Sequence, residues 1–114
     1  MNNKEIINLL KEERNALDLQ RHNIKETNRR LNLQIRRLTD DINRMSPAVK
    51  KRFAPRLRRQ IKISRENIDN NNYYLLRTWS EKNIRWENKC TDNGICWFKL
   101  TQLIEEERGW GIYI

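Results

Sequence analysis

The sequence lacks most of the features that would indicate an enzyme. Its 114 residues include one histidine and three glycines. They form no glycine-rich phosphate loop, no nucleophile elbow and no pair of carboxylates in a catalytic motif. His22, the single histidine, stands in no arrangement typical of a general base. We therefore expect a protein that is not an enzyme, and we predict no catalytic residue.

Cysteine is nearly as scarce, which argues against a metal centre, a cofactor and a disulfide framework. Cys90 and Cys96 are the only cysteines, and with His22 they lack the short paired spacings of zinc sites. No apolar signal region follows Met1, so we expect reduced thiols and a cytoplasmic location, the host cytoplasm if the protein is viral. The longest apolar run, 95–98, is too short to span a membrane, and we expect no membrane partner.

Glycine and proline are too few for the many turns of a β-sandwich. Hydrophobic residues make up 37% of the chain and charged residues 34%, and the mean hydropathy is −1.00. This balance is typical of helical and coiled-coil proteins, which bury narrow apolar stripes. Four tryptophans argue against disorder. Composition and length together predict a single all-α domain, 1–114.

Hydrophobic residues recur at intervals of seven through the first part of the chain, at Leu10, Leu17, Ile24, Leu31, Leu38 and Met45. This heptad pattern predicts a long helix over 1–45 with a coiled-coil seam. Arg14, Arg21 and Asn28 occupy the other seam position in its middle. Burying the two arginines requires pairing or hydration. Asn28 lies either in a half-covered part of the seam or at the interface of a parallel homodimer.

A second apolar stripe predicts a return helix over 57–89. Its members are Leu57, Ile61, Ser64, Ile68, Leu75, Trp79 and Trp86. A fold-back of the chain sets Leu38 opposite Ile61, Leu31 opposite Ile68 and Ile24 opposite Leu75, and each pair of residue numbers has the same sum. This register favours a long antiparallel helical hairpin that resembles a coiled coil, with Leu10, Leu17, Trp79 and Trp86 closing its open end.

Prolines and glycines mark the boundaries of these elements. Ser46 and Pro47 have the types preferred at a helix start, and Pro55 lies too deep for a first turn, so 46–56 is predicted to be a kinked connection. The Asn93-Gly94 pair predicts a turn. After it we expect a short helix over 95–108, with a β-hairpin as the alternative, and an apolar tail over 109–114. In the short helix, the inward-facing residues are expected to be Trp97, Leu100, Leu103 and Ile104.

The strongest functional signal is a segment between Lys50 and Arg65 that contains basic residues and no acidic residue. Such a concentration of positive charge indicates an anionic partner, and arginine suits forked contacts to phosphate. The sequence therefore predicts a small accessory protein that binds DNA or RNA with little sequence readout. The predicted nucleic-acid-binding residues are Lys50, Lys51, Arg52, Arg56, Arg58, Arg59, Lys62, Arg65, Arg36 and Arg37. A solvated charged face without a ligand is the alternative.

A rival function is a phage or mobile-element adaptor or inhibitor that binds a nucleic-acid-processing protein complex. The basic connection would enter an acidic or nucleic-acid channel of that complex. The apolar tail would anchor the partner through Trp110, Ile112 and Tyr113. The same tail could instead fold back and close the open end of the hairpin. Phe53, Tyr73 and Tyr74 could stack on bases, although core or edge packing is the alternative for each.

Overall fold

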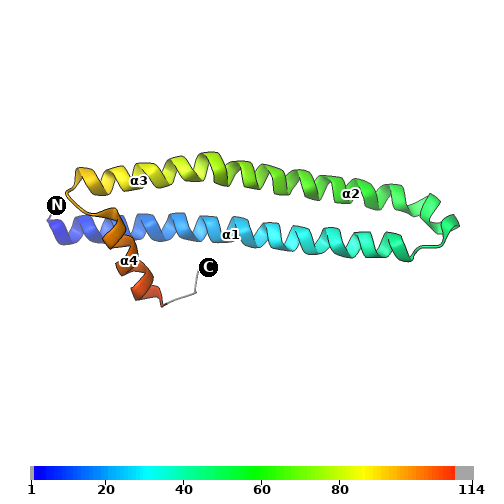
Figure 1. Cartoon of the computed structure of the whole chain (residues 1–114), viewed down its shortest axis with the longest axis horizontal. Helices are drawn as coiled ribbons and strands as arrows, with labels where there is room; N and C mark the ends of the chain where they lie inside the picture. Colours follow the sequence, from blue (N-terminus) through cyan, green and yellow to red (C-terminus); the bar gives the residue numbers. More distant parts are fainter. Residues whose placement is uncertain (1, 110–114) are drawn as a thin grey trace. The chain divides into compact units, whose positions relative to one another are not determined.

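The structure, a computed structural model, describes residues 2–109, and within this range it is helical and contains no strand (Figure 1). The elements are α1 (Asn3–Arg44), α2 (Pro47–Tyr74), a π-helix η1 (Leu75–Trp79), α3 (Ser80–Asp92) and α4 (Trp97–Arg108). The prediction of an all-α protein is confirmed, and the alternative of a β-hairpin at Asn93-Gly94 is wrong. None of the described helices has both the length and the apolarity needed to cross a membrane.

The chain divides into two compact units, which we describe separately. Unit 1 combines Met1–Asn23 with Leu75–Ile114, and unit 2 is the intervening segment Ile24–Tyr74. Helix α1 therefore contributes its first part to unit 1 and its second part to unit 2.

The start of α1 is capped by a side chain. The Asn2 Oδ1 atom accepts a hydrogen bond from the Glu5 backbone N–H at 2.9 Å, and this satisfies one of the N–H groups that the first turn leaves without a partner. Beyond that cap, α1 contains neither glycine nor proline. An uninterrupted helix follows, because nothing in its sequence removes a backbone hydrogen bond.

The core of unit 2 is small. Its buried members are Ile42, Ala54 and Ile61, against which Ile35, Leu38 and Leu57 pack. Leu38 and Ile61 thus belong to one cluster, as the register predicts. Asn28 is hydrogen-bonded to two residues of the same chain: it donates to Asn72 at 3.0 Å and accepts from Asn71 at 2.9 Å.

Helix α2 includes the segment 47–56 that the sequence predicts as a kinked connection. The helix begins at Pro47, where the Lys50 N–H donates to the Ser46 carbonyl at 2.8 Å. Pro55 lies inside the helix. Because proline has no N–H, the carbonyl one turn earlier loses its partner and the helix bends there, as the first turns of α2 show in Figure 1. Ala54 is completely buried at this bend.

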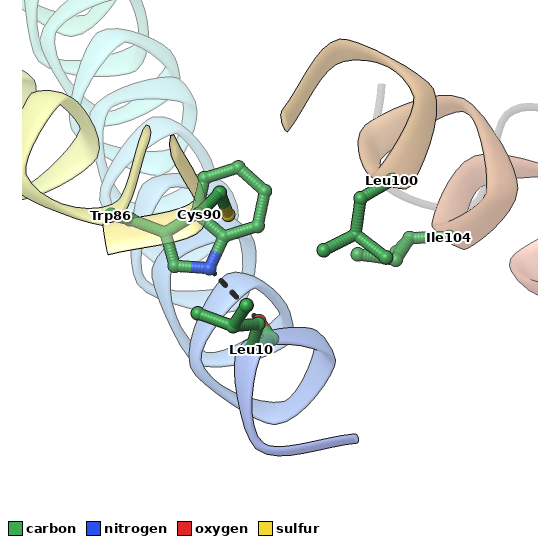
Figure 2. Close-up of a cluster of buried hydrophobic side chains, with 5 residues drawn as sticks. All are labelled: Leu10, Trp86, Cys90, Leu100 and Ile104. Carbon is green, nitrogen blue, oxygen red and sulfur yellow. Dashed lines mark hydrogen bonds between the residues drawn. The ribbon is translucent and has the colours of Figure 1, made fainter. Parts of the chain in front are cut away.

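The core of unit 1 is built around Trp86 (Figure 2). Its buried residues are Leu10, Trp86, Cys90, Leu100 and Ile104, and Ile6, Ile7, Leu17 and Ile95 pack against them. The Trp86 Nε1–H donates to the Leu10 carbonyl at 2.9 Å, and the Trp79 Nε1–H donates to the Leu17 carbonyl at 2.8 Å. The two tryptophans, placed in the core by the sequence pattern, are 3% and 8% exposed.

The same tryptophans explain how the seam of α1 tolerates Arg14 and Arg21. The Arg14 guanidinium lies 5.1 Å from the Trp86 ring centroid, and that of Arg21 lies 5.0 Å from the Trp79 centroid. Arg14 also forms an ion pair with Asp18 at 3.1 Å. Cation–π contacts and pairing replace the water that the half-buried Arg14 guanidinium loses, whereas Arg21 lies at the surface of unit 1 and is exposed.

Helix α4 packs on a narrower face than predicted. Leu100 and Ile104 are buried as expected, but the prediction that Trp97 and Leu103 face inward is wrong, because they are 38% and 42% exposed. The buried pair is spaced i, i+4 and forms the centre of the apolar face, whereas Trp97 and Leu103 flank it. Charged residues hold the far end of α4, since Lys11 pairs with Glu107 at 2.8 Å and Arg108 pairs with Asp18 at 2.7 Å.

The π-helix η1 shifts the buried stripe of the chain by one residue. In α2 the stripe passes through Leu57, Ile61 and Ser64 at intervals of four and three. If the buried stripe continued at intervals of four and three residues, it would include Arg85 and Lys89, but both are exposed. The buried residues are Trp86 and Cys90, each one position later. A π turn contains one residue more than an α turn allows, and the Ser80 Oγ hydrogen bond to the Leu75 carbonyl spans this turn at 3.0 Å.

The predicted turn at Asn93-Gly94 ends α3 with a glycine in the left-handed region, φ 71°. The Ile95 N–H donates to the Cys90 carbonyl at 2.9 Å and the Gly94 N–H to the Thr91 carbonyl at 2.9 Å. These two bonds define a Schellman motif, which commonly includes a hydrophobic contact across the helix end. Ile95 makes that contact by packing against the cluster that contains Cys90.

The two cysteines should differ strongly in reactivity. Both are free thiols; Cys90 is completely buried and Cys96 is exposed. Burial, followed by the nearby Glu13 carboxylate, raises the pKa of the Cys90 thiol, and the thiolate is the reactive form. We expect a thiol reagent at pH 8 to modify Cys96→Ser roughly a hundredfold more slowly than Cys90→Ser, because Cys90 reacts only after local opening. Equal rates in the folded variants would contradict the buried position of Cys90, and urea should make the rates equal.

Candidate nucleic-acid interface

The two units differ sharply in charge. Unit 2 carries fourteen lysine and arginine residues and five acidic residues, a balance of +9 that equals the formal net charge of the whole chain. In unit 1, ten basic residues and ten acidic residues cancel. The net positive charge of this protein therefore comes from unit 2 alone.

Unit 2 holds every residue of the predicted nucleic-acid interface. Arg36 and Arg37 lie on α1, and the other eight lie on α2. All are exposed except Lys50, which is half-buried. In the part of the chain that the structure describes, none of the ten forms an ion pair. No carboxylate among residues 2–109 therefore compensates these ten charges through an ion pair.

Two arginines that precede the ten predicted interface residues differ from them because they form ion pairs. Arg29 and Arg30 both pair with Glu26, at 2.5 Å and 3.5 Å. The hydrogen bond to Glu26 and its negative charge raise the pKa of Arg29 further above its ordinary value. Because a neighbouring carboxylate already engages them, they are weaker candidates for phosphate contacts than Arg36 and Arg37.

One aromatic side chain lies among the exposed cations. Phe53 is 50% exposed, and the Arg52 guanidinium lies 5.4 Å from its ring centroid. Val49, one turn earlier on α2, is exposed as well. Of the two tyrosines considered for stacking, Tyr73 is exposed and Tyr74 is half-buried. Phe53 is therefore the aromatic whose position within the basic segment suits contact with a base.

A groove of about 630 Å³ runs beside the core of unit 2. Helix α1 lines it with Thr39, Ile42 and Asn43, and α2 lines it with Arg58, Ile61, Lys62, Arg65, Glu66 and Asp69. Arg58, Lys62 and Arg65 share one face of α2 because they are spaced by four and three residues. The sequence predicts these three cations as binding residues, but it does not predict the groove. The groove exists because α1 packs beside α2 and brings Thr39 and Asn43 opposite the three cations.

The other residues predicted to form a site belong to the apolar tail, 109–114. Trp110, Ile112 and Tyr113 lie outside the described residues. Within residues 2–109, no group of three histidine, cysteine, aspartate or glutamate side chains is placed to hold a metal ion. Comparison of the chain with protein-family models, with curated proteins and with solved structures finds no match.

Proposed function

We propose that this protein is a small, non-enzymatic accessory protein that binds nucleic acid by gripping its phosphates with unit 2. The observation that carries the proposal is the confinement of the entire net charge, +9, to unit 2. Ten of its cations are free of ion pairs within the described residues. Repulsion among like charges destabilises the protein alone, and a polyanion relieves it.

The composition of this surface suits phosphate better than a generic acidic partner. Seven of the ten cations are arginines, whose planar guanidinium donates two parallel hydrogen bonds to one phosphate. No helix matches a known motif for reading base edges in the major groove. We therefore expect contacts mainly to the backbone and little sequence specificity.

We further propose that the architecture is an antiparallel helical hairpin with its basic end at the connection between α1 and α2. Support comes from contacts within each unit. In unit 2, Asn28 contacts Asn71, and the sum of these residue numbers is the one that the predicted register requires. In unit 1, Leu10 and Leu17 accept the hydrogen bonds of Trp86 and Trp79. A hairpin would place the cations of unit 2 around one tip, where they can surround a strand of nucleic acid.

The test of this function is the salt dependence of binding. If about six cations neutralise phosphates of a duplex, the slope of log affinity against log salt concentration should be near −5, because each contributes about 0.9. The measurement is fluorescence anisotropy of a labelled oligonucleotide titrated at several KCl concentrations. A protein that fails to bind at low salt, or that binds with no dependence on salt, would contradict the proposal.

A second candidate function is docking to a protein partner, and one observation favours it. Trp97 and Phe98 on α4 pack edge to face with ring centroids 6.0 Å apart, and both are exposed, as is Leu103. Exposed aromatic residues are typical of interface anchors. This surface belongs to unit 1, whose net charge is zero, so it is separate from the cations proposed to bind phosphate. Absence of nucleic-acid binding in the salt titration would leave this candidate as the better one.

A further inference from the structure

The groove of unit 2 has a graded charge along its α2 wall. Arg58, Lys62 and Arg65 come first, and Glu66 and Asp69 follow. From Arg58 to Asp69 this wall extends about 16 Å along the helix axis, taking 1.5 Å per residue. Neither acid forms an ion pair with these cations among the described residues. The groove therefore offers hydrogen-bond donors at one end and acceptors at the other.

The remaining walls complete a site for a ligand with both polar and apolar parts. Ile42 and Ile61 form an apolar floor, and each is 7% exposed. On the α1 side, the Asn43 amide can donate and accept, whereas the Thr39 hydroxyl already donates to the Ile35 carbonyl at 2.7 Å. A volume of about 630 Å³ lies in the range of sites that bind small organic groups.

A nucleotide combines a phosphate, a flat base and hydrogen-bonding groups on that base, which are the parts that the cations, the apolar floor and the two acids of this groove would recognise. Its phosphate is recognised by the cationic end, its base covers the apolar floor, and its amino or hydroxyl groups donate to Glu66 and Asp69. The base must be unpaired for this, because a duplex holds its bases stacked and presents phosphates outward. A groove that binds a base in this way would distinguish single strands from duplexes.

We propose that the groove lined by Arg58, Lys62 and Arg65 binds an unpaired nucleotide, which makes single-stranded nucleic acid the preferred ligand of this protein. The inference rests on the proposed function and specifies the class of nucleic acid. It separates the basic residues of α2 into a set that lines the groove and a set that does not, of which Arg52, Arg56 and Arg59 are members.

The experiment compares two triple variants of the full chain that lose the same charge. The probes are a short labelled single strand and the duplex of the same sequence, at one salt concentration. The unaltered protein should bind the single strand at least about tenfold more tightly, since one additional charge-assisted contact is worth that factor. Arg58→Ala/Lys62→Ala/Arg65→Ala should abolish this preference. Arg52→Ala/Arg56→Ala/Arg59→Ala should weaken both complexes by similar factors and keep the preference.

A second pair of variants tests the groove without removing charge. Asn43→Trp should fill the groove and reduce the preference for the single strand. Gln34→Trp, two and a half turns earlier and so on the opposite side of α1, should leave it unchanged. Equal affinities of the unaltered protein for both probes, or equal effects of the two triple variants on the preference, would overturn the inference while leaving phosphate binding intact. Failure to bind either probe would overturn the proposed function as well.

Discussion

Replacing Trp86 by alanine should lower the free energy of unfolding of unit 1 by about 3–5 kcal/mol, the range for aromatic residues truncated in a core. The side chain is 3% exposed and lies at the centre of the unit 1 cluster. The substitution also removes the indole N–H that donates to the Leu10 carbonyl and the ring beside the Arg14 guanidinium. Each of these losses adds to the cost of the cavity.

The matched control is Trp97→Ala, the same chemical change at the edge of α4, where the indole is 38% exposed. Its cost should be clearly smaller. Trp86→Phe keeps most of the apolar volume and removes the hydrogen bond, so its cost should be intermediate. Urea unfolding followed by circular dichroism gives the free energies, and amide hydrogen exchange in α3 assigns the loss to unit 1. A Trp86→Ala effect no larger than that of Trp97→Ala would show that the cluster is not the core of unit 1.

The largest effect on function should follow from alanine at Arg56, Arg58 and Arg59 together. Each exposed guanidinium is expected to make a charge-assisted contact worth about 1.5 kcal/mol, so three lost contacts weaken nucleic-acid binding roughly a thousandfold at low salt. The slope of log affinity against log salt concentration should become less negative by about 2.7. Helicity should be preserved, because alanine is a strong helix former.

The control for that variant removes the same number of charges from unit 1. Lys4, Arg85 and Lys99 are exposed and form no ion pair among the described residues. Their triple alanine variant should bind within about threefold of the unaltered protein, because it keeps all the cations of unit 2 that are proposed to contact phosphate. Similar losses in the two triple variants would mean that net charge, and not the surface of unit 2, determines binding.

The sequence predicts helices well in this protein because their pattern is local. The heptad residues of α1, the turn at Gly94 and the burial of Trp79 and Trp86 follow from spacing and residue type. Ala54 and Cys90 are missed for a different reason. A small residue is buried completely only where two backbones approach closely, and Cys90 continues the buried stripe one turn beyond Trp86, where the predicted stripe ends.

In the candidate site, too, the sequence predicts features that depend on single residues but not features that depend on how the helices pack. Exposure of the cations could be expected from their charge, and the structure places them at the surface. The absence of compensating ion pairs could not be foreseen, because Lys62 and Arg65 stand four residues before Glu66 and Asp69, a spacing that favours pairing. The groove depends on which faces of α1 and α2 pack together, and a single helix pattern does not determine that.

The additional residue in η1 has a consequence for the history of this chain. A π turn has the geometry that a one-residue insertion into an α-helix would produce. A homologue without that residue should be one residue shorter between positions 75 and 79 and should contain an unbroken α-helix there. Any alignment that forbids a gap at this point would pair Trp86 and Cys90 with surface positions of such homologues and would conceal the shared ancestry.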